Sequence, residues 1–150
     1  MIDSHVTKEL FMNKLNNLPQ VSLNTMNEVH EEEVSIINKL FYSLDNEDDF
    51  NTISECLATL LMHVQEHFSS EEKLMKESRY PSFRMHKANH DKVLNELRYA
   101  QMQFRNKKDK DLLREYLEDN IVAWLDQHIK AMDVPMADFI LHIQNVSNNK

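Results

Sequence analysis

The chain has 150 residues, enough for one domain with a sizeable core, and it contains no glycine and only three prolines. Because hairpin turns and phosphate-binding loops depend on glycine, this composition disfavours sheets and predicts an all-α protein. The net charge of −8 comes without a basic stripe, which argues against nucleic-acid binding. A single cysteine allows no disulfide within the chain, and no apolar run reaches membrane-spanning length, so we expect a cytoplasmic protein without membrane contact.

The first twenty residues are expected to stand apart from the rest of the chain. Residues 3–18 place apolar side chains at helical spacing until Pro19 interrupts them, which predicts a short helix. We therefore expect an N-terminal arm over residues 1–20 that lies on a main body over residues 21–145.

The main body begins with a long amphipathic helix. This helix is expected to start at Asn24 or Thr25, either of which can cap it, and to run to about Leu44. Its apolar stripe includes His30. The acidic stretch 45–49 follows as a loop that also caps the next helix, where negative charge is favourable.

The second and third helices each carry a pair of candidate ligands. The second is expected over about residues 50–78, with His67 and Glu71 on its buried side. The third follows a Tyr-Pro-Ser break and has His86 and His90 on one face. Residues four apart lie about 40° apart around a helix, so each pair can point at one spot.

The fourth helix carries His128 and Asp133 after a long apolar stripe. Pro135 is expected to end or kink this helix just after Asp133. Short connections between four long helices predict an antiparallel up-down-up-down four-helix bundle.

Five histidines and two carboxylates thus fall on the buried faces of four helices, and we predict that they bind metal. They are His30, His67, Glu71, His86, His90, His128 and Asp133. Burying these groups without a partner is costly, and a metal pair would relieve that cost. Imidazole and carboxylate suit iron, zinc or manganese, and carboxylates can bridge two ions. Seven ligands are too many for one transition-metal ion, so the pattern favours two.

Four segments of the chain together resemble a known family. They are Met26-Asn-Glu-Val-His30, His67-Phe-Ser-Ser-Glu71-Glu72-Lys-Leu-Met75, Tyr80-Pro81 before the His86 and His90 pair, and Trp124-Leu-Asp-Gln-His128 followed by Asp133. In this pattern the chain resembles the hemerythrins, specifically the single-domain bacterial hemerythrin-like proteins, across about residues 24–140.

The resemblance implies an oxo- or hydroxo-bridged non-haem di-iron centre that binds O2 reversibly. By this resemblance one iron is held by His86, His90 and His128, the other by His30 and His67, and both by Glu71 and Asp133. The second iron keeps an open position for O2. Trp124 and Leu125, one turn before His128, are suited to line an apolar O2 pocket.

Other residues near this set have simpler interpretations. His63, one turn before His67, stands where the family often has a tyrosine. We interpret it as a hydrogen-bonded or core neighbour of the ligands. The alternative is that His63 is itself an extra or alternative ligand. The acidic run 31–33 and Glu72 are interpreted as solvated helix faces.

The resulting functional prediction is an O2-binding protein rather than an enzyme, serving O2 storage, delivery, scavenging or the protection of oxygen-sensitive enzymes. Two alternatives share the same ligands. One is a di-iron redox enzyme, peroxidase-like or nitric-oxide-reducing, and His63 is the feature that favours it. The other is an O2 or redox sensor that acts through a separate protein partner, which the sequence does not name.

Overall fold

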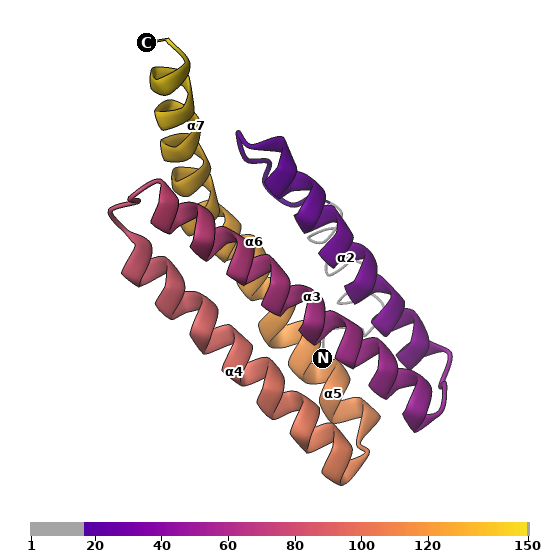
Figure 1. The fold of residues 1–150 in the computed structure, drawn as a ribbon. Helices are drawn as coiled ribbons and strands as arrows, with labels where there is room; N and C mark the ends of the chain where they lie inside the picture. Colours follow the sequence, from indigo (N-terminus) through magenta and orange to yellow (C-terminus); the bar gives the residue numbers. More distant parts are fainter. Residues whose placement is uncertain (1–16, 150) are drawn as a thin grey trace.

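The computed structural model describes residues 17–149, and this part of the chain is all-helical (Figure 1). Its elements are α2 (Asn24–Asp45), α3 (Phe50–Glu77), α4 (Phe83–Lys107), α5 (Lys110–Tyr116), the π-helical segment η1 (Leu117–Val122), α6 (Ala123–His128), the π-helical segment η2 (Ile129–Asp133) and α7 (Val134–Asn148). The last five follow one another directly and form a fourth long helical column. The predicted arm over residues 1–20 lies outside the described residues except for its last four.

The four columns pack into a four-helix bundle. α2 contacts α3, α3 contacts α4, α4 contacts α5, and α5 contacts α2, so each column has two neighbours. The turns after α2 and after α4 lie at one end of the bundle, and the turn after α3 lies at the other (Figure 1). The bundle therefore has one end where α3 meets α4, and the candidate ligands of both helices stand near this end.

The helix boundaries agree with the sequence patterns except at two places. Asp49 caps α3 as predicted, because its carboxylate accepts the backbone N–H of Thr52 at 2.8 Å. The predicted cap of α2 by Asn24 or Thr25 is wrong, since Leu23 holds the N-cap position and no side chain caps this helix. At Pro135 the sequence predicted an end or a kink, and the helix does not end there, because α7 continues through it to Asn148.

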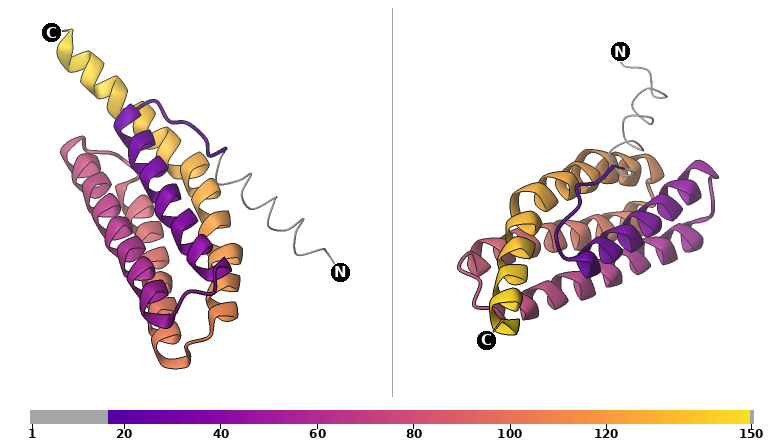
Figure 2. Two further views of the ribbon diagram at one scale, coloured as in Figure 1. Left: turned by 90° about the vertical axis from the view of Figure 1, so that its right-hand side faces the viewer. Right: turned by 90° about the horizontal axis from the view of Figure 1, so that it is seen from above.

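The fourth helical column bends between α6 and α7, and α7 extends beyond the other helices (Figure 2). Pro135 explains the change, because it lacks an N–H and its ring collides with the carbonyl four residues back in a regular α-helix. The π-helical segment η2 stands just before it and changes the hydrogen-bond register there. The predicted kink near Pro135 is thus present.

The core is apolar over most of the bundle and polar near the α3–α4 turn. Fully buried side chains include Leu40, Ile53, Leu57, Leu60, Leu97, Leu117, Leu125, Ile129 and Met136. Each contributes about 1.5–3 kcal/mol relative to an exposed side chain, an upper range because unfolded chains already bury some surface. No helix among the described residues is long and apolar enough to cross a membrane.

Candidate metal centre

The structure brings all seven predicted ligands together inside the bundle. Each is buried, with between 0% and 5% of its surface exposed. α2 supplies His30, α3 supplies His67 and Glu71, and α4 supplies His86 and His90. The fourth column supplies the remaining two, His128 and Asp133.

The seven residues form two groups that share both carboxylates. The three-histidine group consists of Glu71, His86, His90, His128 and Asp133, and the two-histidine group of His30, His67, Glu71 and Asp133. Within each group, one nitrogen or oxygen per residue lies within 4.8 Å of every other. This spacing suits two ions that share carboxylate ligands.

Each carboxylate turns one oxygen to each group. Oδ1 of Asp133 lies 3.0 Å from Nε2 of His128 and 3.1 Å from Nε2 of His86. Its Oδ2 lies 3.0 Å from Nε2 of His30. Oε1 of Glu71 lies 3.2 Å from Nε2 of His90.

The second oxygen of Glu71 faces the two-histidine group, because Oε2 lies 2.6 Å from Nε2 of His67. The two carboxylates therefore have the orientation that a pair of bridging ligands requires.

The hydrogen bonding of the three-histidine group fits a site for a cation. One buried atom of each member lacks a hydrogen-bond partner among the described residues: Nε2 of His86, His90 and His128, Oε1 of Glu71 and Oδ1 of Asp133. These atoms are close to one another yet do not hydrogen bond. These five buried atoms are in ion-pair contact but make no hydrogen bond, which is costly, and a metal ion would satisfy all of them. In the two-histidine group, by contrast, each Nε2 is paired with a carboxylate oxygen.

The π-helical segment η2 explains how His128 and Asp133 reach the same centre. In a regular α-helix, residues five apart point about 140° away from each other. In a π-helix each N–H bonds the carbonyl five residues back, so residues i and i+5 lie on the same face of the helix. η2 covers the interval from Ile129 to Asp133 and brings both side chains to one face.

Hydrogen bonds on the outer ring nitrogens hold three of the histidines. Nδ1 of His67 lies 3.0 Å from Oε1 of Glu33. Nδ1 of His90 lies 3.2 Å from Oε2 of Glu72. The interpretation of the acidic run as a solvated face is wrong for Glu33, which is 2% exposed because it lies three residues after His30 on the same helix face.

The third of these partners, Asn89, was missed at the sequence level. Its Oδ1 lies 2.6 Å from Nδ1 of His128 and accepts the indole N–H of Trp124 at 3.0 Å. Asn89 directly precedes His90, and only the packing of α4 against the fourth column reveals its role.

His63 lies beside the centre but in neither group. Its Nδ1 is 3.3 Å from Oε1 of Glu33 and its Nε2 is 3.2 Å from Oε2 of Glu32. Its ring centroid is 6.4 Å from that of His67. His63 therefore contacts Glu33, which also contacts the candidate ligand His67, and stands at the edge of the core with 17% of its side chain exposed.

Aromatic rings pack against two of the histidines. Phe68 stacks on His90 at 3.9 Å between centroids, and Trp124 stacks on His128 at 4.4 Å. Trp124 and Leu125 also line a narrow apolar cavity that reaches Glu33. None of the seven candidate ligands lines this cavity, and Trp124 itself packs on a histidine of the three-histidine group.

Without metal, protonation of the histidines balances part of the negative charge of the buried carboxylates. Burial lowers the pKa of His86, but its contacts with Asp133 and Glu71 outweigh burial and raise it to about 9. Burial likewise opposes protonation of His67, yet the charges of Glu33 and Glu71 hold its pKa well above the usual value. Burial raises the pKa of Glu33, while His67 and His63 lower it to about 2.

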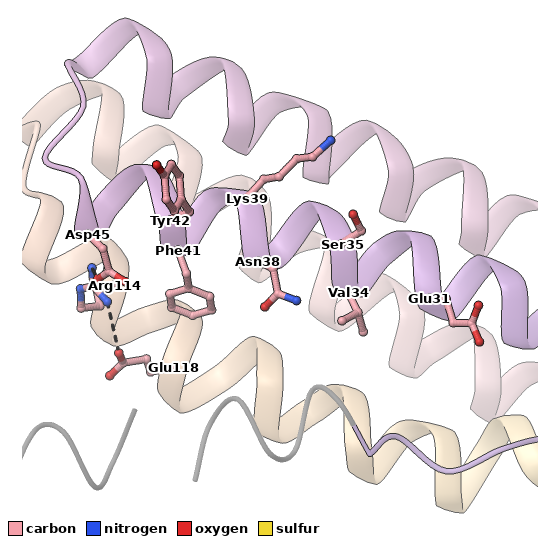
Figure 3. Close-up of a pocket in the computed structure, with 10 residues that line it drawn as sticks. All are labelled: Glu31, Val34, Ser35, Asn38, Lys39, Phe41, Tyr42, Asp45, Arg114 and Glu118. Atoms are coloured by element: carbon pink, nitrogen blue, oxygen red, sulfur yellow. Dashed lines mark hydrogen bonds and ion pairs between the residues drawn. The ribbon is translucent and has the colours of Figure 1, made fainter. Parts of the chain in front are cut away.

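A larger surface pocket of about 640 Å³ lies between α2 and α5 and holds none of the seven candidate ligands (Figure 3). Val34, Phe41 and Tyr42 line it together with the Arg114–Glu118 ion pair of 3.7 Å. It stands on the outside of the bundle, so it is separate from the candidate metal centre.

Fold and site together define a metal-binding helical bundle, and comparison with known proteins identifies its kind. The family of the hemerythrin HHE cation binding domain matches residues 21–137. The chain is also 30% identical over 108 residues to the bacteriohemerythrin of Aquifex aeolicus (strain VF5), an alignment that covers 72% of this chain and 82% of that protein. The chain therefore belongs to the hemerythrin family, which confirms the resemblance seen in the sequence.

Proposed function

We propose that this protein is a non-haem di-iron protein that binds O2 reversibly, in O2 storage, delivery, scavenging or the protection of oxygen-sensitive enzymes. The observation that carries the proposal is the pair of buried groups that share Glu71 and Asp133. The hemerythrin family and the bacteriohemerythrin relative support iron and O2 as the occupants. A cytoplasmic location remains a prediction of the sequence.

In this proposal, His86, His90 and His128 hold one iron ion, His30 and His67 hold the other, and Glu71 and Asp133 bridge them. The three-histidine group offers five protein ligands and the two-histidine group four. Two bound iron ions would supply the electrons for reversible O2 binding, and the smaller ligand count leaves the vacancy in the two-histidine group. Trp124 and Leu125 would supply apolar lining near the centre, because they border an apolar cavity that Glu33 also lines.

The ligand positions also support the antiparallel up-down-up-down order of the bundle. His30 stands in the first half of α2, whereas His67 and Glu71 stand in the second half of α3. These residues meet only if the two helices run in opposite directions. We propose residues 21–145 as the metal-binding unit, with residues 1–20 as an arm outside it.

A di-iron redox enzyme is the second candidate, and one contact favours it. His63 and Glu33 form a chain of polar contacts that leads from His67 to the edge of the core. Such a chain suits the proton supply that turnover would need. Reversible O2 binding has no need of it.

Metal analysis and absorption spectra of the purified protein test the proposal. We expect close to two iron atoms per chain and, after the reduced protein meets air, a visible charge-transfer band that disappears when O2 is removed. One iron per chain, or stoichiometric zinc without iron uptake, would contradict the di-iron centre. Rapid irreversible oxidation with two irons present would favour the enzyme.

A further inference from the structure

Glu33 places a buried carboxylate between two histidines of α3. Its Oε1 lies 3.0 Å from Nδ1 of His67 and 3.3 Å from Nδ1 of His63. Among residues 17–149 these two histidines are its ion-pair partners, and no lysine or arginine shares its charge. A carboxylate that is 2% exposed is costly to bury when histidines are its ion-pair partners, because a metal-bound histidine is neutral, and this cost calls for a role at this position.

The geometry directs this charge at one ring of the centre. Nε2 of His67 faces inward, 2.6 Å from Oε2 of Glu71. A histidine that binds metal through Nε2 keeps its ring proton on Nδ1, and a carboxylate that accepts this proton fixes the ring and raises the donor strength of Nε2. Glu33 stands where that acceptor is needed.

The three-histidine group has weaker partners of this kind. Nδ1 of His90 lies 3.2 Å from Glu72, whose side chain is 18% exposed and shares its charge with Lys87 at 3.4 Å. Nδ1 of His128 meets the neutral amide of Asn89.

Two histidines have no such partner. Nδ1 of His30 and Nδ1 of His86 make no hydrogen bond within the described residues. Glu33 therefore differs from every other outer partner of the centre, because it is buried, charged and not neutralised by a lysine or arginine.

We infer that Glu33 is a positioning residue for the two-histidine group, which orients His67 and strengthens its Nε2 as a ligand. Glu33 thereby tightens metal binding in that group and favours the higher oxidation state of the metal held there. The inference rests on the proposed metal centre but not on O2 binding.

The test uses Glu33→Gln, which removes the charge and keeps a carbonyl oxygen for the Nδ1 proton, and Glu33→Ala, which removes both. Glu32→Gln is the matched control, because Glu32 is the neighbouring residue, 65% exposed in its side chain, and contacts His63 alone. The metal-free proteins are titrated with Co²⁺, whose absorption reports binding. We expect binding to the two-histidine group to weaken by about 10- to 100-fold in Glu33→Gln, and further in Glu33→Ala. Glu32→Gln should bind as the unchanged protein does.

The reduction potential of the iron-loaded proteins is the second measurement. Loss of the negative charge in Glu33→Gln should raise it, whereas a purely structural tie between α2 and α3 would change the melting temperature and leave the potential unaltered. Equal Co²⁺ affinities and equal potentials in Glu33→Gln and Glu32→Gln would overturn the inference. Failure of O2 to bind, with the Co²⁺ effect intact, would instead overturn only the proposed function.

Discussion

Oδ2 of Asp133 lies 3.0 Å from Nε2 of His30, although the two residues stand 103 positions apart in the sequence. The other oxygen of Asp133 faces His86 and His128. One side chain therefore contacts both groups of the candidate centre from the end of a π-helical segment.

This relationship predicts how metal loss depends on the ligand removed. Glu71→Ala or Asp133→Ala should lower metal occupancy in both groups, because each carboxylate turns one oxygen to each. His30→Ala should lower occupancy mainly in the two-histidine group. Metal analysis with a two-step Co²⁺ titration measures the difference, and complete loss of both metals in all three variants would contradict the division into two groups.

Pro135 offers a test of the π-helical segment. Pro135→Ala restores a backbone N–H and removes the ring clash, which favours a regular α-helix from Ile129 onward by up to about 3 kcal/mol. A regular helix would turn Asp133 away from His128. We therefore expect the metal-free variant to melt higher and to bind metal more weakly than the unchanged protein.

Pro81→Ala is the control for this experiment, since Pro81 lies in the turn between α3 and α4 rather than within a helix. Pro81→Ala should not show the two effects expected of Pro135→Ala together, namely a higher melting temperature of the metal-free protein and weaker metal binding. Unchanged metal affinity in Pro135→Ala would show that the position of Asp133 does not depend on the proline.

The sequence predicted which candidate ligands of α3 and α4 would lie together, because their spacing depends on helix geometry. His67 with Glu71, and His86 with His90, share a face in any α-helix, so the sequence spacing alone predicts that each pair lies together. Glu33 escaped prediction because the run of three glutamates was interpreted as one solvated face, although Glu33 lies three residues after His30 on the buried face of the same helix.

Two features of the backbone also escaped the sequence patterns. The π-helical segment η2 depends on the balance between Pro135 and the packing of its neighbours, which no residue pattern reports. Leu23 became the N-cap of α2 because the side chain of Asn27 holds the preceding segment instead, with hydrogen bonds of 2.9 Å to both the N–H and the carbonyl of Val21.

The turns of a chain without glycine predict a simple stabilising change. Glu47, Arg79 and Lys108 each adopt a left-handed conformation with φ of 53°. Glu47 is exposed in the turn between α2 and α3, far along the bundle from the metal centre. Glu47→Gly should raise the free energy of unfolding by about 1 kcal/mol, because glycine has no Cβ to oppose this conformation.

Glu55→Gly is the matched control, since Glu55 is an exposed glutamate inside α3. It should lower the free energy of unfolding by about 1 kcal/mol. Denaturant unfolding of the three proteins gives the comparison, and a loss of stability in Glu47→Gly would contradict the interpretation.

His63→Phe tests whether His63 is a ligand. Because His63 lies in neither group and contacts Glu33 and Glu32, we expect the iron count to stay at two while the rate of oxidation changes. His67→Phe, four residues later, should reduce the iron count. A reduced count in His63→Phe as well would make His63 a ligand and our interpretation of it wrong.

The last prediction concerns pH and metal removal. In the metal-free protein the pKa of His86 is raised to about 9 by Asp133 and Glu71 against the effect of burial, and that of His67 is also raised. A raised pKa in the folded state stabilises the protein fully below the unfolded value of 6.5, and this contribution is lost as the pH rises through about 9. The metal-free protein should therefore melt at a lower temperature near pH 9 than near pH 6.

Metal must displace these protons in order to bind, so its affinity should rise over the same interval. The increase in melting temperature on adding Zn²⁺ should be larger near pH 9 than near pH 6, because the metal binds more tightly and replaces charge that the protons no longer supply. Thermal unfolding of the metal-free and Zn²⁺-loaded proteins across this range measures both effects. His142→Ala, at an exposed position on α7, should reproduce the unchanged profile. A metal-free protein that becomes steadily more stable from pH 6 to pH 9 would show that protons do not balance the charges of Glu71 and Asp133.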